Sequence, residues 1–167
     1  MNLLKITLIS LFLGLAASVS AQQTKLLSKP SETPEDYKAN EPNVIATVDW
    51  IENTPINENE ELHKMQYGLL IQWISGSPTV TLSLQAYVMD YTKKNSDLLA
   101  IFMGGWTRYA LQNEYTTDAL QCNLAGVQSM IKVYKTGKLK KDKKMDELVK
   151  LEADGKLEAW LKDQIKE

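Results

Sequence analysis

The chain has very little of the residues on which most metal and nucleophilic sites depend. It contains one cysteine, Cys122, one histidine, His63, and one arginine, Arg108, beside eighteen lysines. A single cysteine cannot form a disulfide within the chain, and a single histidine excludes a histidine-rich zinc site. Arginine forks are the usual readers of phosphate and nucleic acid. Their scarcity and a formal net charge of −2 therefore argue against a nucleic-acid partner.

The motifs of common cofactor sites and catalytic nucleophiles are also missing. The sequence has no glycine-rich phosphate loop, no EF-hand loop and no G-x-S-x-G stretch. Glu60 and His63 have the i, i+3 spacing of di-iron helical bundles, but such a site needs two of these motifs. We therefore expect no metal and no cofactor. We expect His63 to be an exposed histidine near the start of a helix.

The first residues have the pattern of a cleaved export signal. Lys5 precedes an apolar run over 6–17, and small residues up to Ala21 suit a signal peptidase. The run is short for a stable membrane anchor, which is the alternative interpretation. We therefore expect a signal peptide over 1–21, a periplasmic or secreted chain, and no integral membrane protein after cleavage.

The rest of the chain divides into an arm and a helical domain. Polar residues and three prolines fill 22–42, which predicts a flexible N-terminal arm. Apolar residues recur at helical spacing over 43–167. The expected helices cover 43–53, 58–75, 78–94, 96–115 and 117–136, and two short helices follow a basic connector over 138–144. The predicted fold is an all-α single domain, a helical bundle or stacked helical hairpins of about six to seven helices.

The segment 78–94 is ambiguous between a helix and a strand. Residues 79–84 alternate strictly between β-branched or apolar and polar residues, as a strand does. No second clear strand is available to pair with it, and a lone strand is not stable. We therefore expect a helix.

Two adjacent glycines, Gly104 and Gly105, interrupt the helix expected over 96–115. Each interior glycine costs a helix about 1 kcal/mol relative to alanine, so the pair needs a physical reason. One reason is a close crossing with the helix over 117–136, one face of which carries only small residues, namely Ala119, Cys122, Ala125, Gly126 and Ser129. We expect this crossing, with Cys122 buried and inert in it.

The glycine pair has two other interpretations. It could be the floor of a ligand site, and the candidate binding residues are then Gly104, Gly105, Trp106, Arg108 and Tyr109. It could also mark a kink in the helix. The ligand site is kept here as a hypothesis beside the close crossing.

These absences favour a non-enzymatic binding or interaction protein whose partner, a protein or an envelope component, the sequence does not identify. Such a module predicts an exposed apolar patch. A small-ligand carrier with its pocket beside the two glycines is one alternative. The other is a carboxylate-dependent hydrolase of cell-envelope polymers, which predicts two facing carboxyls, one with a raised pKa. Its candidate acids lie near expected helix ends: Asp90, Asp97, Glu114 and Asp118.

Overall fold

The structure, a computed structural model, describes residues 25–165 and contains in that range seven helices and no strand. The helices are α1 (Pro34–Asn53), α2 (Glu60–Gly76), α3 (Ala86–Thr92), α4 (Asp97–Gln112), α5 (Ala119–Tyr134), α6 (Lys143–Ala153) and α7 (Leu157–Gln164). The predicted all-α single-domain bundle is confirmed. The signal peptide expected over 1–21 lies outside the described residues. None of the described helices combines the length and apolar character that a bilayer crossing requires.

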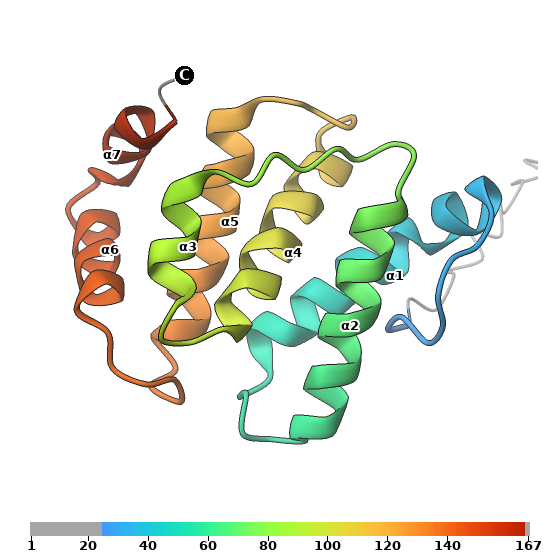
Figure 1. Ribbon diagram of the computed structural model, residues 1–167, viewed down its shortest axis with the longest axis horizontal. Helices are drawn as coiled ribbons and strands as arrows, with labels where there is room; N and C mark the ends of the chain where they lie inside the picture. The colour runs from blue at the N-terminus through green and yellow to red at the C-terminus, as the bar shows by residue number, and fades with distance from the viewer. Residues whose placement is uncertain (1–24, 166–167) are drawn as a thin grey trace, which may run out of the picture.

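Helix α4 is the centre of the bundle (Figure 1). It packs against α1, α2, α3 and α5, and the α4–α5 contact is the most extensive in the molecule. Its buried side chains include Leu98, Ile101, Phe102 and Trp106. Helices α6 and α7 lie on the far side of α5 from α4, at the left of Figure 1. The core is therefore built around the α4–α5 hairpin, as the wide apolar face of the 96–115 segment predicts.

The two central helices cross at their glycines, so the predicted close crossing is confirmed. A Cβ added at Gly105 would overlap the Ser129 side chain and lie 2.8 Å from the Ala125 carbonyl oxygen. A Cβ added at Gly126 would lie 2.7 Å from the Phe102 ring. Only glycine lets the two backbones approach this closely. Gly68 in α2 makes no such close approach, because no described residue lies within 4 Å of its added Cβ.

The structure differs from the predicted arm over 22–42. Helix α1 starts at Pro34, and a capping box between Thr33 and Asp36 fixes this start. The helix then continues through Pro42. Of the residues before it, Leu27 is buried, and its backbone N–H donates to Thr47 Oγ1 at 2.9 Å. The described part of the predicted arm is thus folded against the bundle, and half of the predicted 22–42 range belongs to the described α1 or packs beside it.

The helix expected over 78–94 is wrong for its first half. Only α3 is helical, and residues 78–85 form neither helix nor strand. They run as an extended connection across the end of α4 to reach α3 (Figure 1). Within this connection Val80 is buried while Leu84 is exposed. The β-branched residues favour the extended backbone, but no strand lies beside it for ladder hydrogen bonds.

Candidate functional site

The five residues proposed from sequence as a ligand site lie mostly inside helix contacts. Gly104 faces Val48 and Leu70, each 3.1 Å from an added Cβ, and Gly105 faces Ser129. Trp106 is buried in the core, and Tyr109 is partly buried against it. Arg108 is also engaged, because its guanidinium is held by two carboxylates of α1. None of the five lines the cavity described below, and ligand binding by them stays a prediction.

Arg108 belongs to an ion cluster that joins α1, α4 and α5. Its two terminal nitrogens donate to both oxygens of Glu52, at 3.0 and 2.7 Å, and one also donates to Asp49 at 2.6 Å. Ser129 Oγ donates to Glu52 at 2.5 Å, and Lys132 Nζ lies 3.1 Å from the same carboxylate. The side chain of Glu52 is only 2% exposed. Four donors thus satisfy one buried carboxylate beside the glycine crossing.

The charge state of Glu52 follows from this cluster. Burial alone would raise its pKa, but the hydrogen bonds from Arg108 and Ser129 outweigh burial and hold the pKa below the usual value. The carboxylate is therefore ionised at neutral pH and cannot serve as a general acid there. Both oxygens of the Glu52 carboxylate are occupied by donors from α4 and α5. The cluster therefore has a structural role and links α1, α4 and α5.

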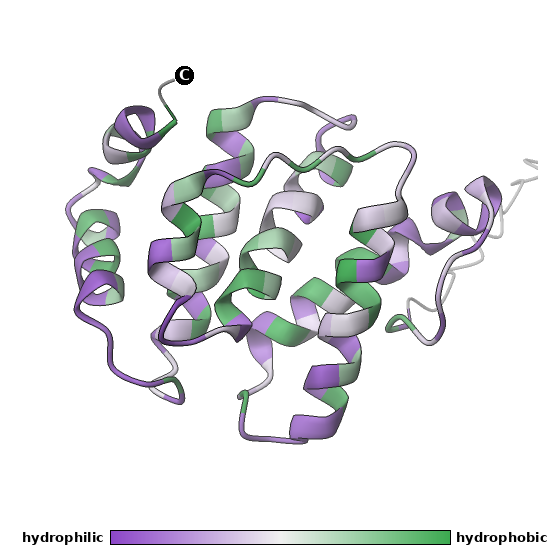
Figure 2. Cartoon of the chain, viewed as in Figure 1, coloured by the Kyte–Doolittle hydropathy of each residue, from purple (hydrophilic) through white to green (hydrophobic). Residues whose placement is uncertain are grey.

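A cavity of about 290 Å³ lies at another place, where three chain segments meet. Its wall comes from 56–67, at the loop before α2 and the start of that helix, from 94–97, at the start of α4, and from the loop 138–140. In Figure 2 the start of α2 and the loop before α6 are hydrophilic, whereas the first half of α4 is hydrophobic. The lining of the cavity is mostly polar, and its aliphatic side chains are Ile56 and Leu139.

His63 is the most unusual residue in the wall of this cavity. It is 2% exposed, so the expectation of an exposed histidine is wrong. Its imidazole packs against two aromatic rings. The ring centroids are 4.5 Å apart for Trp50 and 5.8 Å apart for Tyr67. Neither ring nitrogen makes a hydrogen bond of ordinary geometry among the described residues, although the Pro55 carbonyl lies close enough to favour the protonated ring. A buried polar atom left unpaired costs about 1–3 kcal/mol, so the imidazole lowers the stability of the fold unless a partner is supplied.

Burial also sets the protonation of His63 and Tyr67. It lowers the pKa of His63, while the Pro55 carbonyl and the Asp97 carboxylate act weakly in the opposite direction. Burial raises the pKa of Tyr67 above its usual range, and its hydroxyl also has no partner in the described structure. At neutral pH the cavity wall therefore offers a neutral imidazole and a neutral phenol. Each can donate one hydrogen bond and accept another.

Asn95 holds the third segment of the wall in place. Its Nδ2 donates to the Lys140 carbonyl at 2.9 Å, and its Oδ1 accepts from the Lys140 N–H at 2.9 Å. The Asn95 side chain lies at the joint between α3 and α4 and is buried. These two hydrogen bonds fix the backbone of the basic connector against the start of α4. The lysines on either side of Leu139 are thereby brought to the cavity rim.

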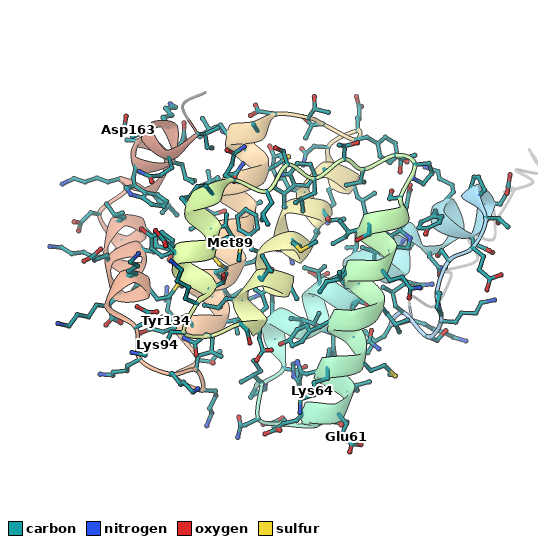
Figure 3. The ribbon with its side chains drawn as sticks, viewed as in Figure 1. Glu61, Lys64, Met89, Lys94, Tyr134 and Asp163 are labelled. Atoms are coloured by element: carbon teal, nitrogen blue, oxygen red, sulfur yellow. The ribbon has the colours of Figure 1, made fainter. Side chains whose placement is uncertain are left out.

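The rim carries more positive than negative charge. Four lysines line the cavity, Lys64, Lys94, Lys138 and Lys140, against the two carboxylates of Glu60 and Asp97, which leaves a net charge of +2. Figure 3 shows Lys64 near the beginning of α2 and Lys94 at the end of α3, at the same end of the bundle. Within residues 25–165, Lys94, Lys138 and Lys140 form no ion pair, and Lys64 reaches Glu60 only at 4.0 Å.

The four acids considered for a hydrolase are not brought together across a groove. Asp97 starts α4 and Glu114 follows its end, so a helix of 16 residues, about 24 Å long, separates them. Asp118 caps α5 through the Gln121 N–H. Asp90 pairs with Lys93 and Lys144, which lower its pKa. The carboxyl pKa values that the described structure clearly shifts are all lowered, which is opposite to what a general acid needs.

The position of His63 had a signal in the sequence that the helical pattern obscured. Helical spacing predicts a core stripe of Leu62, Met65, Leu69 and Trp73 on α2. Trp73 is buried as predicted, but the buried stripe otherwise runs through His63, Gln66 and Tyr67. Met65 is 49% exposed. Because His63 and Gln66 are polar, this face of α2 looked solvent-exposed in the sequence. The single histidine of the chain was the one residue that pointed to the cavity wall.

Comparisons with protein-family models, with curated proteins and with solved structures gave no match.

Proposed function

We propose that this chain is a non-enzymatic binding protein of the periplasm or the extracellular space that takes a small ligand into the His63 cavity. The observation that carries the proposal is the pair of buried, unpartnered polar side chains, His63 and Tyr67, in the wall of one cavity. The volume of about 290 Å³ is close to the lower end of the usual range for small-molecule sites.

The exposed apolar residues favour a small ligand over a protein partner. The large apolar side chains that are exposed in the described range are Met65, Ile71, Leu84 and Met89. Met65 and Ile71 share α2 but lie about 120° apart around its axis, so they do not form one stripe. Apolar residues exposed singly are ordinary on soluble proteins and indicate no interface.

A ligand screen tests the proposal through the only imidazole in the chain. We expect some members of a small-fragment library to shift the NMR resonances of His63. Ser96→Tyr should abolish these shifts, because residue 96 lines the cavity and its side chain makes no capping hydrogen bond. Ser83→Tyr, in the exposed connection, is the matched control. The proposal fails if no fragment moves the His63 signals, if the shifts survive Ser96→Tyr, or if the Ser83→Tyr control loses them as well.

Export is the second part of the proposal, and it rests on the pattern of residues 1–21. Expression of the full chain in a bacterial host should yield a processed protein outside the cytoplasm that begins near Gln22. Mass spectrometry of the periplasmic and culture fractions measures this directly. Recovery of the unprocessed chain in the cytoplasm alone would contradict it.

A further inference from the structure

We propose that the ligand of the His63 cavity is a small dianion, such as a phosphate monoester or a dicarboxylate. This inference rests on the proposed function and adds the chemical class of the ligand. Its basis is the combination of a net charge of +2 on the lining residues with two buried side chains that lack partners. Neither feature alone defines a site, but they occur in the same wall.

The lysines are placed to meet a negative group at the rim. Lys94 and Lys140 are contributed by neighbouring segments that Asn95 ties together through its two hydrogen bonds to residue 140. Their ammonium groups have no carboxylate partner in the part of the chain that the structure describes. An unpaired, mobile ammonium contacts an oxyanion as a point charge and does not need the planar fork of arginine. The scarcity of arginine therefore does not exclude such a ligand.

The two carboxylates in the wall limit the charge that the cavity accepts. Asp97 lies at the start of α4, where it already faces the positive end of the helix dipole, and Glu60 lies near Lys64. With His63 neutral, the remaining positive charge matches two negative charges. A phosphate monoester carries about −1.5 to −2 at pH 7, and a dicarboxylate carries a similar charge.

The buried end of the ligand would be polar and uncharged. His63 and Tyr67 each offer a donor and an acceptor, and both are neutral at pH 7. Ile56 and Leu139 provide apolar surface beside them. These atoms have almost no accessible surface, so a hydroxyl or carbonyl group attached to the anion would satisfy them once the neighbouring side chains move aside. Discrimination against analogues that lack such a group is then strong, since binding them would leave buried polar atoms unpaired.

Direct binding measurements test this inference. Calorimetry with glycerol 3-phosphate and with malate should show binding, and glycerol should show none. Lys94→Gln/Lys140→Gln should weaken dianion binding by at least about tenfold, because two charge contacts are removed. The matched control is Lys150→Gln/Lys156→Gln, which removes the same charge from exposed lysines outside the cavity and should leave binding unchanged. Binding should also weaken as salt is added.

The outcomes separate this inference from the proposed function. If neutral fragments shift His63 but neither dianion binds, the cavity binds ligands and the charge assignment is overturned. If both double variants weaken dianion binding equally, the effect is general charge attraction and the assignment is again overturned.

Flotation with phosphatidic acid vesicles and with phosphatidylcholine vesicles identifies a lipid source. If the protein floats with the phosphatidic acid vesicles alone, and the Lys94→Gln/Lys140→Gln variant does not, the dianion belongs to a lipid headgroup.

Discussion

Gly105 of α4 lies directly against Ser129 of α5, at a spacing that leaves no room for a Cβ atom between the two helices. The same serine hydroxyl donates to the buried carboxylate of Glu52 in α1. Gly105 therefore does more than permit a close crossing. It brings α5 near enough for α1, α4 and α5 to share one ion cluster.

Gly105→Ala should destabilise the protein by about 1–3 kcal/mol, because the new methyl group pushes α5 away from α4 at Ser129 and at the Ala125 backbone. Gly68→Ala is the matched control within another helix. Nothing lies within 4 Å of its added Cβ, so it should stabilise the fold by up to about 1 kcal/mol. Urea denaturation of both variants measures the two free energies of unfolding. Equal effects of the same sign would contradict the crossing.

Glu52→Ala should lower the free energy of unfolding by roughly 3–5 kcal/mol, since it leaves Arg108 partly buried without its main partner. Glu147→Ala removes the same charge from an exposed position of α6 and should change stability by less than about 0.5 kcal/mol. Thermal and urea denaturation at low and high salt compare the two. A small effect of Glu52→Ala would show that the cluster does not hold the helices together.

Acidification should destabilise the protein in two stages. The folded pKa of His63 is lowered, so the unfolded chain binds its proton first and stability falls as pH drops below about 6.5. The folded pKa of Glu52 is also lowered, so its contribution is present above about pH 4.5 and is lost as pH falls through the folded pKa. An NMR titration of the single imidazole checks the first stage directly. A His63 pKa at or above 6.5 would contradict its burial.

Cys122 should be unreactive in the folded protein. It is buried, and burial raises the pKa of its thiol to about 11, so little thiolate exists at neutral pH. We expect slow labelling by a thiol reagent such as Ellman's reagent at pH 8, and complete labelling in denaturant. Fast labelling of the native chain, at a rate close to that of a free thiol, would contradict the burial of the α5 small-residue face.

The α4–α5 hairpin could be predicted from sequence because its signals are local and agree with one another. A wide apolar face, two glycines and a stripe of small residues on the next helix all indicate one close contact. The start of α1 was missed because Pro42 suggests a break. Thr33, Pro34 and Asp36 supply a strong helix start, and the exposed Pro42 is then accommodated inside the helix at the loss of one hydrogen bond.

The cavity could not be predicted because no local pattern connects its parts. His63, Asn95 and Lys140 are far apart in the sequence, and although the single histidine stands out, nothing in its own segment relates it to the other two. The basic connector predicted over 138–144 is solvent-exposed at most of its side chains. Its role at the rim follows from Asn95, whose two hydrogen bonds join residues 45 positions apart.

The assembly of the cavity wall from three distant stretches of chain has a consequence for how binding and folding are coupled. No fragment that ends before the 138–140 loop contains the whole wall, so the proposed ligand would bind tightly only to a polypeptide that has already closed its tertiary structure. Occupancy would then protect the entire bundle against unfolding and proteolysis in proportion to ligand concentration. A rise in melting temperature with added compound would report on the site before any partner is identified.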